Sequence, residues 1–171
     1  MNMTGYGAAH AVRLACAAAI FCSLWWPGHA AAVDAPLEAQ RGLGFLGSLV
    51  GEYPAKTGLW DHRLLNRRLH ALLGKRLAFF RANMWNTTTV SRQGGLVYVT
   101  GTRLSLAGRD GAIFVADIAR DTVWVWLMIS GQLFEYRERP LAPDVPAEVA
   151  LFIDNWQTIS RAGGAPATSY Q

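Results

Sequence analysis

Cysteine is scarce in this chain of 171 residues, and the positions of its two cysteines limit what the protein can be. Cys16 and Cys22 both lie in an apolar stretch near the start, and no cysteine follows them. The rest of the sequence therefore offers no internal disulfide, no thiolate nucleophile and no cysteine ligand for a metal ion. We expect the fold to be held by its hydrophobic core alone.

The sequence also lacks the short motifs of common catalytic and nucleotide-binding sites. It has no P-loop and no serine in a G-x-S-x-G context. Gly42, Gly44 and Gly47 have the spacing of a dinucleotide-binding motif, but no predicted strand precedes them. Glu135 and Glu138 are three residues apart on a predicted strand, so they face opposite sides and do not suit a glycosidase pair. We expect a protein that is not an enzyme and has no cofactor.

Histidine is equally sparse. After residue 32 the chain has only His62 and His70, which fall on one predicted helix. Metal-binding pairs on a helix prefer the i, i+4 spacing, which these two do not have. We expect no metal site.

The first 32 residues have the three-part pattern of a secretory signal peptide. Arg13 is their only lysine or arginine, and the apolar run at 14–26 is shorter than the ~20 residues of a membrane span. The small residues at 30–32 fit a cleavage site. The alternative is an uncleaved N-terminal anchor. We expect cleavage, and therefore a periplasmic protein with no stable membrane span after processing.

The remaining sequence predicts a single α+β domain. We place an irregular lead-in at residues 33–60, the domain at 61–157 and a flexible tail at 158–171. N-terminal helices come first, an antiparallel β-meander of about five strands follows, and a C-terminal helix packs on the sheet. Gly94–Gly95 marks the first hairpin turn. The strands are predicted at about residues 86–92, 95–103, 112–118, 122–130 and 132–138.

Helix signals stand on both sides of this meander. Asp61 is a good N-cap for a first helix, whose leucines recur at helical spacing until Gly74 ends it. A C-terminal helix is predicted over residues 145–157, with Asp144 as its cap. Its apolar stripe consists of Val149, Phe152, Ile153 and Trp156.

Trp124 and Trp126 share one face of the fourth predicted strand, at 122–130. They could stack on a sugar, but such a pair more often belongs to the core beneath a helix. The segment 122–129 is apolar on both faces, which predicts a central strand covered on both sides. We therefore expect both tryptophans to be core residues.

Positive charge gathers at residues 56–81, where Asp61 is the only acidic residue. The basic helix face of Arg63, Arg67 and Arg68 could attract anionic lipid or an acidic protein surface. The alternative is an ordinary solvated helix face. Nucleic acid is not expected as a partner, because the sequence has no nucleic-acid-binding motif.

The segment at 101–111 is the candidate binding element. It joins two predicted strands and contains three glycines, two arginines and two leucines, which is longer and more apolar than a plain turn. Loops on a rigid sheet often carry recognition, although an ordinary connection is the alternative. The residues that we expect to contact a protein partner are Arg103, Leu104, Ser105, Leu106, Arg109 and Asp110.

Four short stretches of the sequence suggest a family when they are taken in order. They are Leu72-Leu73-Gly74, Phe80-x-x-Asn83-Met84, the run GLVYVTG at 95–101 and the run AIFVAD at 112–117. Together they resemble the Ivy type of periplasmic lysozyme inhibitor, over about residues 62–156. The resemblance implies that family's fold and its periplasmic location.

The inhibitory loop of that family is different here. In the family a Cys-x-Pro-His-x-Cys segment forms a disulfide that holds a protruding loop, and the histidine enters the acidic cleft of the lysozyme. Residues 103–108 occupy that place and contain no Cys, Pro or His. Arg103 or Arg109 could instead bind paired carboxylates, since arginine binds them in a bidentate manner. This is a hypothesis from the present sequence, which the resemblance does not imply.

We therefore predict a non-catalytic periplasmic binding or inhibitor protein of Ivy-like fold. Its partner would be a protein, such as a muramidase or another cell-wall lytic enzyme. The alternative is a periplasmic module that binds a small or envelope-derived ligand on its sheet. A hydrolase built from Asp or Glu side chains is a third possibility.

Overall fold

The computed structural model describes residues 42–103, 108–140, 143–163 and 168–170. The predicted signal peptide lies outside these residues, as do Leu104, Ser105 and Leu106 of the predicted binding loop. Within the described ranges, no helix has the length and apolar character needed to cross a membrane.

Helices precede and follow the strands, as the sequence predicts. The 3₁₀ helices are η2 (Leu43–Leu49), η3 (Leu59–Asp61) and η4 (Gly74–Arg76). The α-helices are α1 (Pro54–Thr57), α2 (Arg63–Leu73), α3 (Leu77–Asn83) and α4 (Ala147–Ala162). Gly74, with a φ of 51°, ends α2 where the sequence predicts.

One sheet contains the strands of the described chain, in the order β1-β3-β4-β5-β6-β7, with β2 also paired to β3. All neighbouring pairs are antiparallel except β6 and β7. The predicted α+β class and antiparallel meander are confirmed. The strands are β1 (Asn86–Thr87), β2 (Ser91–Gln93), β3 (Leu96–Thr102), β4 (Gly111–Asp117), β5 (Thr122–Ile129), β6 (Gln132–Arg137) and β7 (Thr168–Tyr170).

Tight turns fix the register of two hairpins. β2 and β3 pair directly around Gly94 and Gly95, which form the two-residue turn that the sequence predicts. β5 and β6 pair directly around Ser130 and Gly131, whose φ angles are 52° and 83°. Positive φ at both central residues is the requirement of a type I′ turn, which suits the twist of a hairpin.

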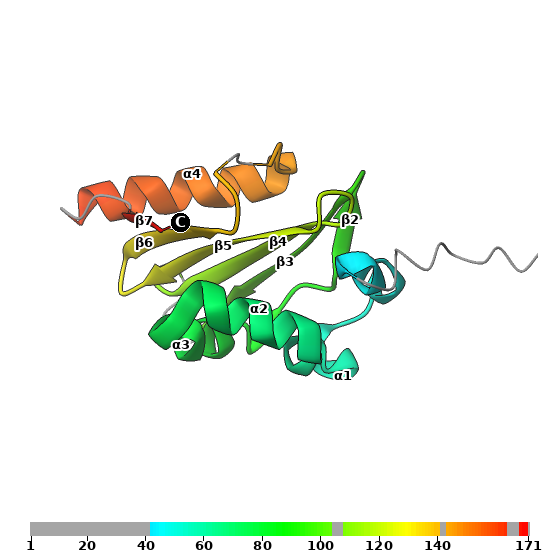
Figure 1. The fold of residues 1–171 in the computed structure, drawn as a ribbon. Coiled ribbons are helices and arrows are strands. Elements are labelled where there is room, and N and C mark those ends of the chain that lie inside the picture. Colours follow the sequence, from blue (N-terminus) through cyan, green and yellow to red (C-terminus); the bar gives the residue numbers. More distant parts are fainter. Residues whose placement is uncertain (1–41, 104–107, 141–142, 164–167, 171) are drawn as a thin grey trace, which may run out of the picture. The chain divides into compact units, whose positions relative to one another are not determined.

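Helices cover both faces of the sheet, with α2 and α3 on one side and α4 on the other (Figure 1). Side chains alternate along the strands, so Val99 joins the core under α2 and α3 while its neighbour Tyr98 joins the core under α4. β5 is buried on both faces, which confirms the predicted central strand. Trp124 and Trp126 are 2% and 5% exposed and pack under α4, so they are core residues and no platform for a sugar.

The helix starts differ from the prediction. Asp61 ends η3, and its carboxylate lies 3.0 Å from the guanidinium of Arg81, so it does not cap α2. His62 precedes α2 without a side-chain cap and stacks on the ring of Phe45. Pro146 precedes α4 in the same way, and Asp144 makes no cap. Both helices are held by the packing of one apolar face rather than by a capping side chain.

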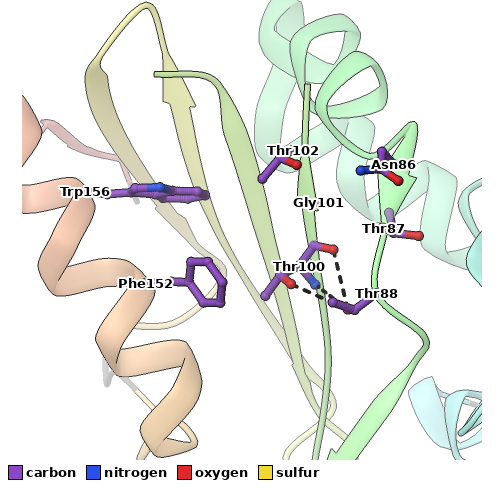
Figure 2. Close-up of a pocket in the computed structure, with 8 residues that line it drawn as sticks. All are labelled: Asn86, Thr87, Thr88, Thr100, Gly101, Thr102, Phe152 and Trp156. Atoms are coloured by element: carbon purple, nitrogen blue, oxygen red, sulfur yellow. Dashed lines mark hydrogen bonds between the residues drawn. The ribbon is translucent and has the colours of Figure 1, made fainter. Parts of the chain in front are cut away.

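Phe152 is a further correction, because the predicted stripe places it in the core under α4. Its side chain is 42% exposed, whereas Val149, Ile153 and Trp156 are buried. Phe152 lies beside Thr100 of β3 at an open groove, so one side of its ring stays accessible (Figure 2).

The segment predicted to be an irregular lead-in contributes to the core. Leu43 and Leu46 of η2 are fully buried, because their i, i+3 spacing puts them on one side of a 3₁₀ helix. Val90 exchanges backbone hydrogen bonds with this segment, donating to Glu52 and accepting from Gly51. The strand predicted at 86–92 is therefore split into β1 and β2. At the other end, α4 continues past residue 157 and β7 lies within the predicted tail.

Candidate binding site

The loop between β3 and β4 has a base that both layers of helices hold. The Asn83 carboxamide at the end of α3 is buried and donates to the carbonyls of Gly111 (2.9 Å) and Met128 (3.1 Å). A Cβ on Gly101 would lie 2.7 Å from the Asn83 carbonyl oxygen, and one on Gly111 would lie 2.6 Å from Cζ2 of Trp156. Glycine at these two positions lets α3 and α4 approach the sheet from opposite sides, which makes the base rigid.

Asp110 has a structural role in this base. Its side chain is only 6% exposed, and Oδ1 accepts a hydrogen bond of 2.5 Å from the backbone nitrogen of Ser130. The backbone of Arg109 makes a second link, since its carbonyl accepts a hydrogen bond of 2.8 Å from Gly131. Asp110 thus ties the returning arm of the loop to the β5–β6 turn. We expected it to contact a partner, but its carboxylate points into the protein.

Arg103 and Arg109 flank the loop at opposite ends, and both are exposed. The guanidinium of Arg103 lies 4.0 Å from the Asp110 carboxylate, and half of the side chain remains exposed. Arg109 donates to the carbonyl of Ser130 (3.4 Å) and lines a shallow pocket with Gly131 and Ile159. Arg103 thus lies near the returning arm of the loop, whereas Arg109 lies against the β5–β6 turn.

Arg68 is not part of a free basic face. Its guanidinium donates to the carboxylates of Glu138 (2.8 Å) and Asp121 (2.8 Å) and to the Asp121 carbonyl. Its side chain is 16% exposed, and the hydrogen bond to Glu138 is the main cause that raises the pKa of Arg68 above its ordinary value. Glu138 also accepts a hydrogen bond from the backbone nitrogen of Val123, and Asp121 accepts one from that of Leu43. Arg68 therefore joins α2 to the sheet.

Arg63 and Arg67 remain as the basic helix face. Both side chains are exposed, and within the described residues neither has a hydrogen bond or an ion pair. They are one helical turn apart, so they lie on the same side of α2. This pair is the accessible part of the basic face that the sequence predicts.

A groove beside the loop was not predicted from the sequence. It lies where β3 meets β1, and one wall comes from α4, through Phe152 and Trp156 (Figure 2). Thr100 and Thr102 of β3 lie on its floor, directly before the loop. The signal in the sequence was the alternation of threonine with small residues at the end of β3, which marks a half-exposed strand face.

Metal chemistry has no support in the described residues. Across residues 42–103, 108–140, 143–163 and 168–170, no three His, Cys, Asp or Glu side chains lie close enough to hold a metal ion. Glu138, one of the carboxylates considered for hydrolysis, is engaged by Arg68 and by the backbone of Val123.

Comparison with known proteins gives one match. The model of the family described as "Inhibitor of vertebrate lysozyme (Ivy)" matches residues 65–159, which is more than half of the chain. No curated protein and no solved structure matches. The matched residues run from the first turn of α2 into α4 and include the β3–β4 loop.

Proposed function

The chain belongs to the Ivy family, and we propose that it is a non-catalytic inhibitor that binds a protein partner through the β3–β4 loop. The partner proposed is a muramidase or a related cell-wall lytic enzyme, and the place of action is the periplasm. The predicted signal peptide at residues 1–32 supports the location. The family's description, which names lysozyme as the target, supports the class of partner.

The observation that carries the proposal is a pair of exposed arginines on a rigid base. Arg103 directly follows β3, and Arg109 comes two residues before β4. Between Arg109 and β4, Asp110 is bound to the β5–β6 turn. A rigid support matters because ordering a flexible loop on binding would reduce the affinity. Glycosidases hold two carboxylates a few ångströms apart, and a guanidinium matches a carboxylate with two parallel hydrogen bonds. The arginines would thus take the role of the loop histidine, which this sequence lacks.

The test is a titration of the processed protein against a vertebrate lysozyme and a lytic transglycosylase, by calorimetry and by inhibition of cell-wall lysis. In the double variant Arg103→Ala/Arg109→Ala, each lost contact in an acidic cleft should cost about 2–5 kcal/mol of binding free energy. Folding should be unaffected, because substitutions at such exposed positions change stability by only ~0.5 kcal/mol.

The matched control is Arg63→Ala/Arg67→Ala, which removes the same charge from α2. It should reduce the association rate slightly at low salt and leave the dissociation rate unchanged. Equal losses in the two double variants would mean that binding depends on overall charge and not on the loop. A wild-type protein that binds neither class of muramidase would rule out the proposed partner.

A further inference from the structure

The groove between β1, β3 and α4 has a volume of about 250 Å³, enough for one small ring. It exists because the single helix α4 covers the middle of the sheet and leaves the face of β3 partly open. Tyr98 is buried under α4, but Thr100 and Thr102, which follow on the same face of the strand, are only half-buried. Figure 2 shows this open strip between the aromatic rings of α4 and the residues of β1.

The aromatic wall of the groove is fixed in place. Trp156 is 4% exposed and lies against Gly111, where even a methyl group would not fit. Phe152 meets Trp156 edge to face, with the ring centroids 6.5 Å apart, and 42% of Phe152 remains exposed. The groove therefore presents one phenyl ring that packs against its own helix and has an accessible side.

The opposite wall is polar. Thr88 is bonded to β3, because its backbone nitrogen donates to the Thr100 carbonyl (2.9 Å) and its hydroxyl accepts from the Thr100 nitrogen (3.2 Å). By contrast, the carboxamide of Asn86 and the hydroxyl of Thr102, which are opposite one another in the β1–β3 pair, make no hydrogen bond to any described residue. These two groups keep their donors and acceptors for water or a ligand.

The lining of the groove excludes two classes of ligand. It contains no ionisable side chain, so it offers nothing to neutralise an anion or a cation. The outer edge of β3 is already paired with β1, Thr88 and β2, so an extended peptide cannot add to it as a further strand. An uncharged ligand with one apolar face and several hydroxyl or amide groups fits both walls.

We propose that this groove binds one neutral sugar unit of a glycan strand. The C–H face of the pyranose ring lies on Phe152, and its hydroxyls bond to Asn86 and Thr102. The site is separate from the arginines of the loop, although Thr102 and Arg103 are adjacent in sequence. The proposal does not rest on the proposed inhibitor function, because it requires no enzyme as partner.

The experiment is an NMR titration of the processed protein with chitotriose and, separately, maltotriose, without any enzyme. A shallow one-unit site should bind with a Kd on the order of 0.1–1 mM. Amide signals of residues 86–88 and 100–102 and the ring signals of Phe152 should shift with at least one of the two sugars. Loss of the ring in Phe152→Ala should weaken binding roughly three- to tenfold, and Thr102→Val roughly threefold.

Phe79→Ala is the matched control, since Phe79 is a phenylalanine of similar exposure (45%) on α3, on the other side of the sheet. It should bind both sugars as the wild type does. The proposal is overturned if neither sugar shifts these signals at about ten times the expected Kd. Equal weakening by Phe152→Ala and Phe79→Ala would also overturn it. Signals that move only when a muramidase is added would make the groove a protein interface, which contradicts the glycan site and leaves the inhibitor proposal standing.

Discussion

Arg68 illustrates how a single residue can connect distant parts of this chain. Its planar guanidinium contacts Asp121 in the β4–β5 turn and Glu138 just after β6, while its backbone belongs to α2. Each carboxylate also accepts a hydrogen bond from a backbone nitrogen, so neither is held in place by the arginine alone. The network is half-sheltered from solvent, where a lost partner costs more than at the surface.

Arg68→Ala should therefore lower the free energy of unfolding by about 1–3 kcal/mol, because Glu138 and Asp121 lose their cation. Arg68→Lys should fall between wild type and alanine, since a point charge cannot bond both carboxylates as the planar fork does. The measurement is urea unfolding followed by circular dichroism. Arg67→Ala, one residue away and exposed, is the control and should stay within ~0.5 kcal/mol of wild type. Identical midpoints for Arg68→Ala and Arg67→Ala would contradict this account.

At the scale of an element, α4 combines a structural face with an exposed one. Val149, Ile153 and Trp156 close the core over Trp124 and Trp126, whereas Phe152 lies on the boundary. Neighbouring positions on this helix should therefore respond very differently to the same truncation.

Ile153→Ala should destabilise the protein by about 2–4 kcal/mol, because it leaves a cavity under α4. Phe152→Ala should cost less than about 1 kcal/mol, since the ring is 42% exposed and alanine favours the helix. Thermal and urea unfolding of the two variants would measure the difference. If Phe152→Ala proved the more damaging change, α4 would have to turn Phe152 rather than Ile153 toward the core.

The predictability of these elements follows from how local their causes are. The sequence predicts features that neighbouring residues determine. These are the period-two pattern of β3 to β6, the turn at Gly94–Gly95 and the end of α2 at Gly74. Two features could not be predicted, because contacts between residues distant in sequence determine them. Val90 pairs with Glu52, which splits the first predicted strand, and Arg68 is hydrogen-bonded to Glu138. Of the predicted site, Arg103 and Arg109 are exposed at the loop base, whereas Asp110 is buried.

At the scale of the whole molecule, each face of the sheet has its own hydrophobic core and its own buried tyrosine. Tyr98 is 8% exposed in the core under α4, near Glu148, and Tyr136 is 3% exposed in the other core, near Arg76. Burial is the main cause that raises the pKa of both phenols above their ordinary value of about 10.

A raised pKa in the folded state gives a stability that falls in alkali. Below about pH 10 both tyrosines are protonated in the folded and unfolded chains, so this contribution is fully present. Above that pH the unfolded chain loses these protons first, and the free energy of unfolding declines as pH rises. Urea midpoints at about pH 8 and about pH 11 should show the loss, and Tyr136→Phe should reduce it. Tyr53→Phe, at an exposed tyrosine, is the control. A loss of the same size in all three proteins would assign it to other groups.

The contacts at the base of the β3–β4 loop have a consequence for substitutions within the loop. Asn83, Gly101, Asp110, Gly111 and Trp156 hold the two ends of the loop, and all of these residues stand outside positions 104–107. None of these contacts uses a side chain of residues 104–107. Substitutions at 104–107 should therefore alter the loop while these contacts, and the ends of β3 and β4 that they hold, stay in place.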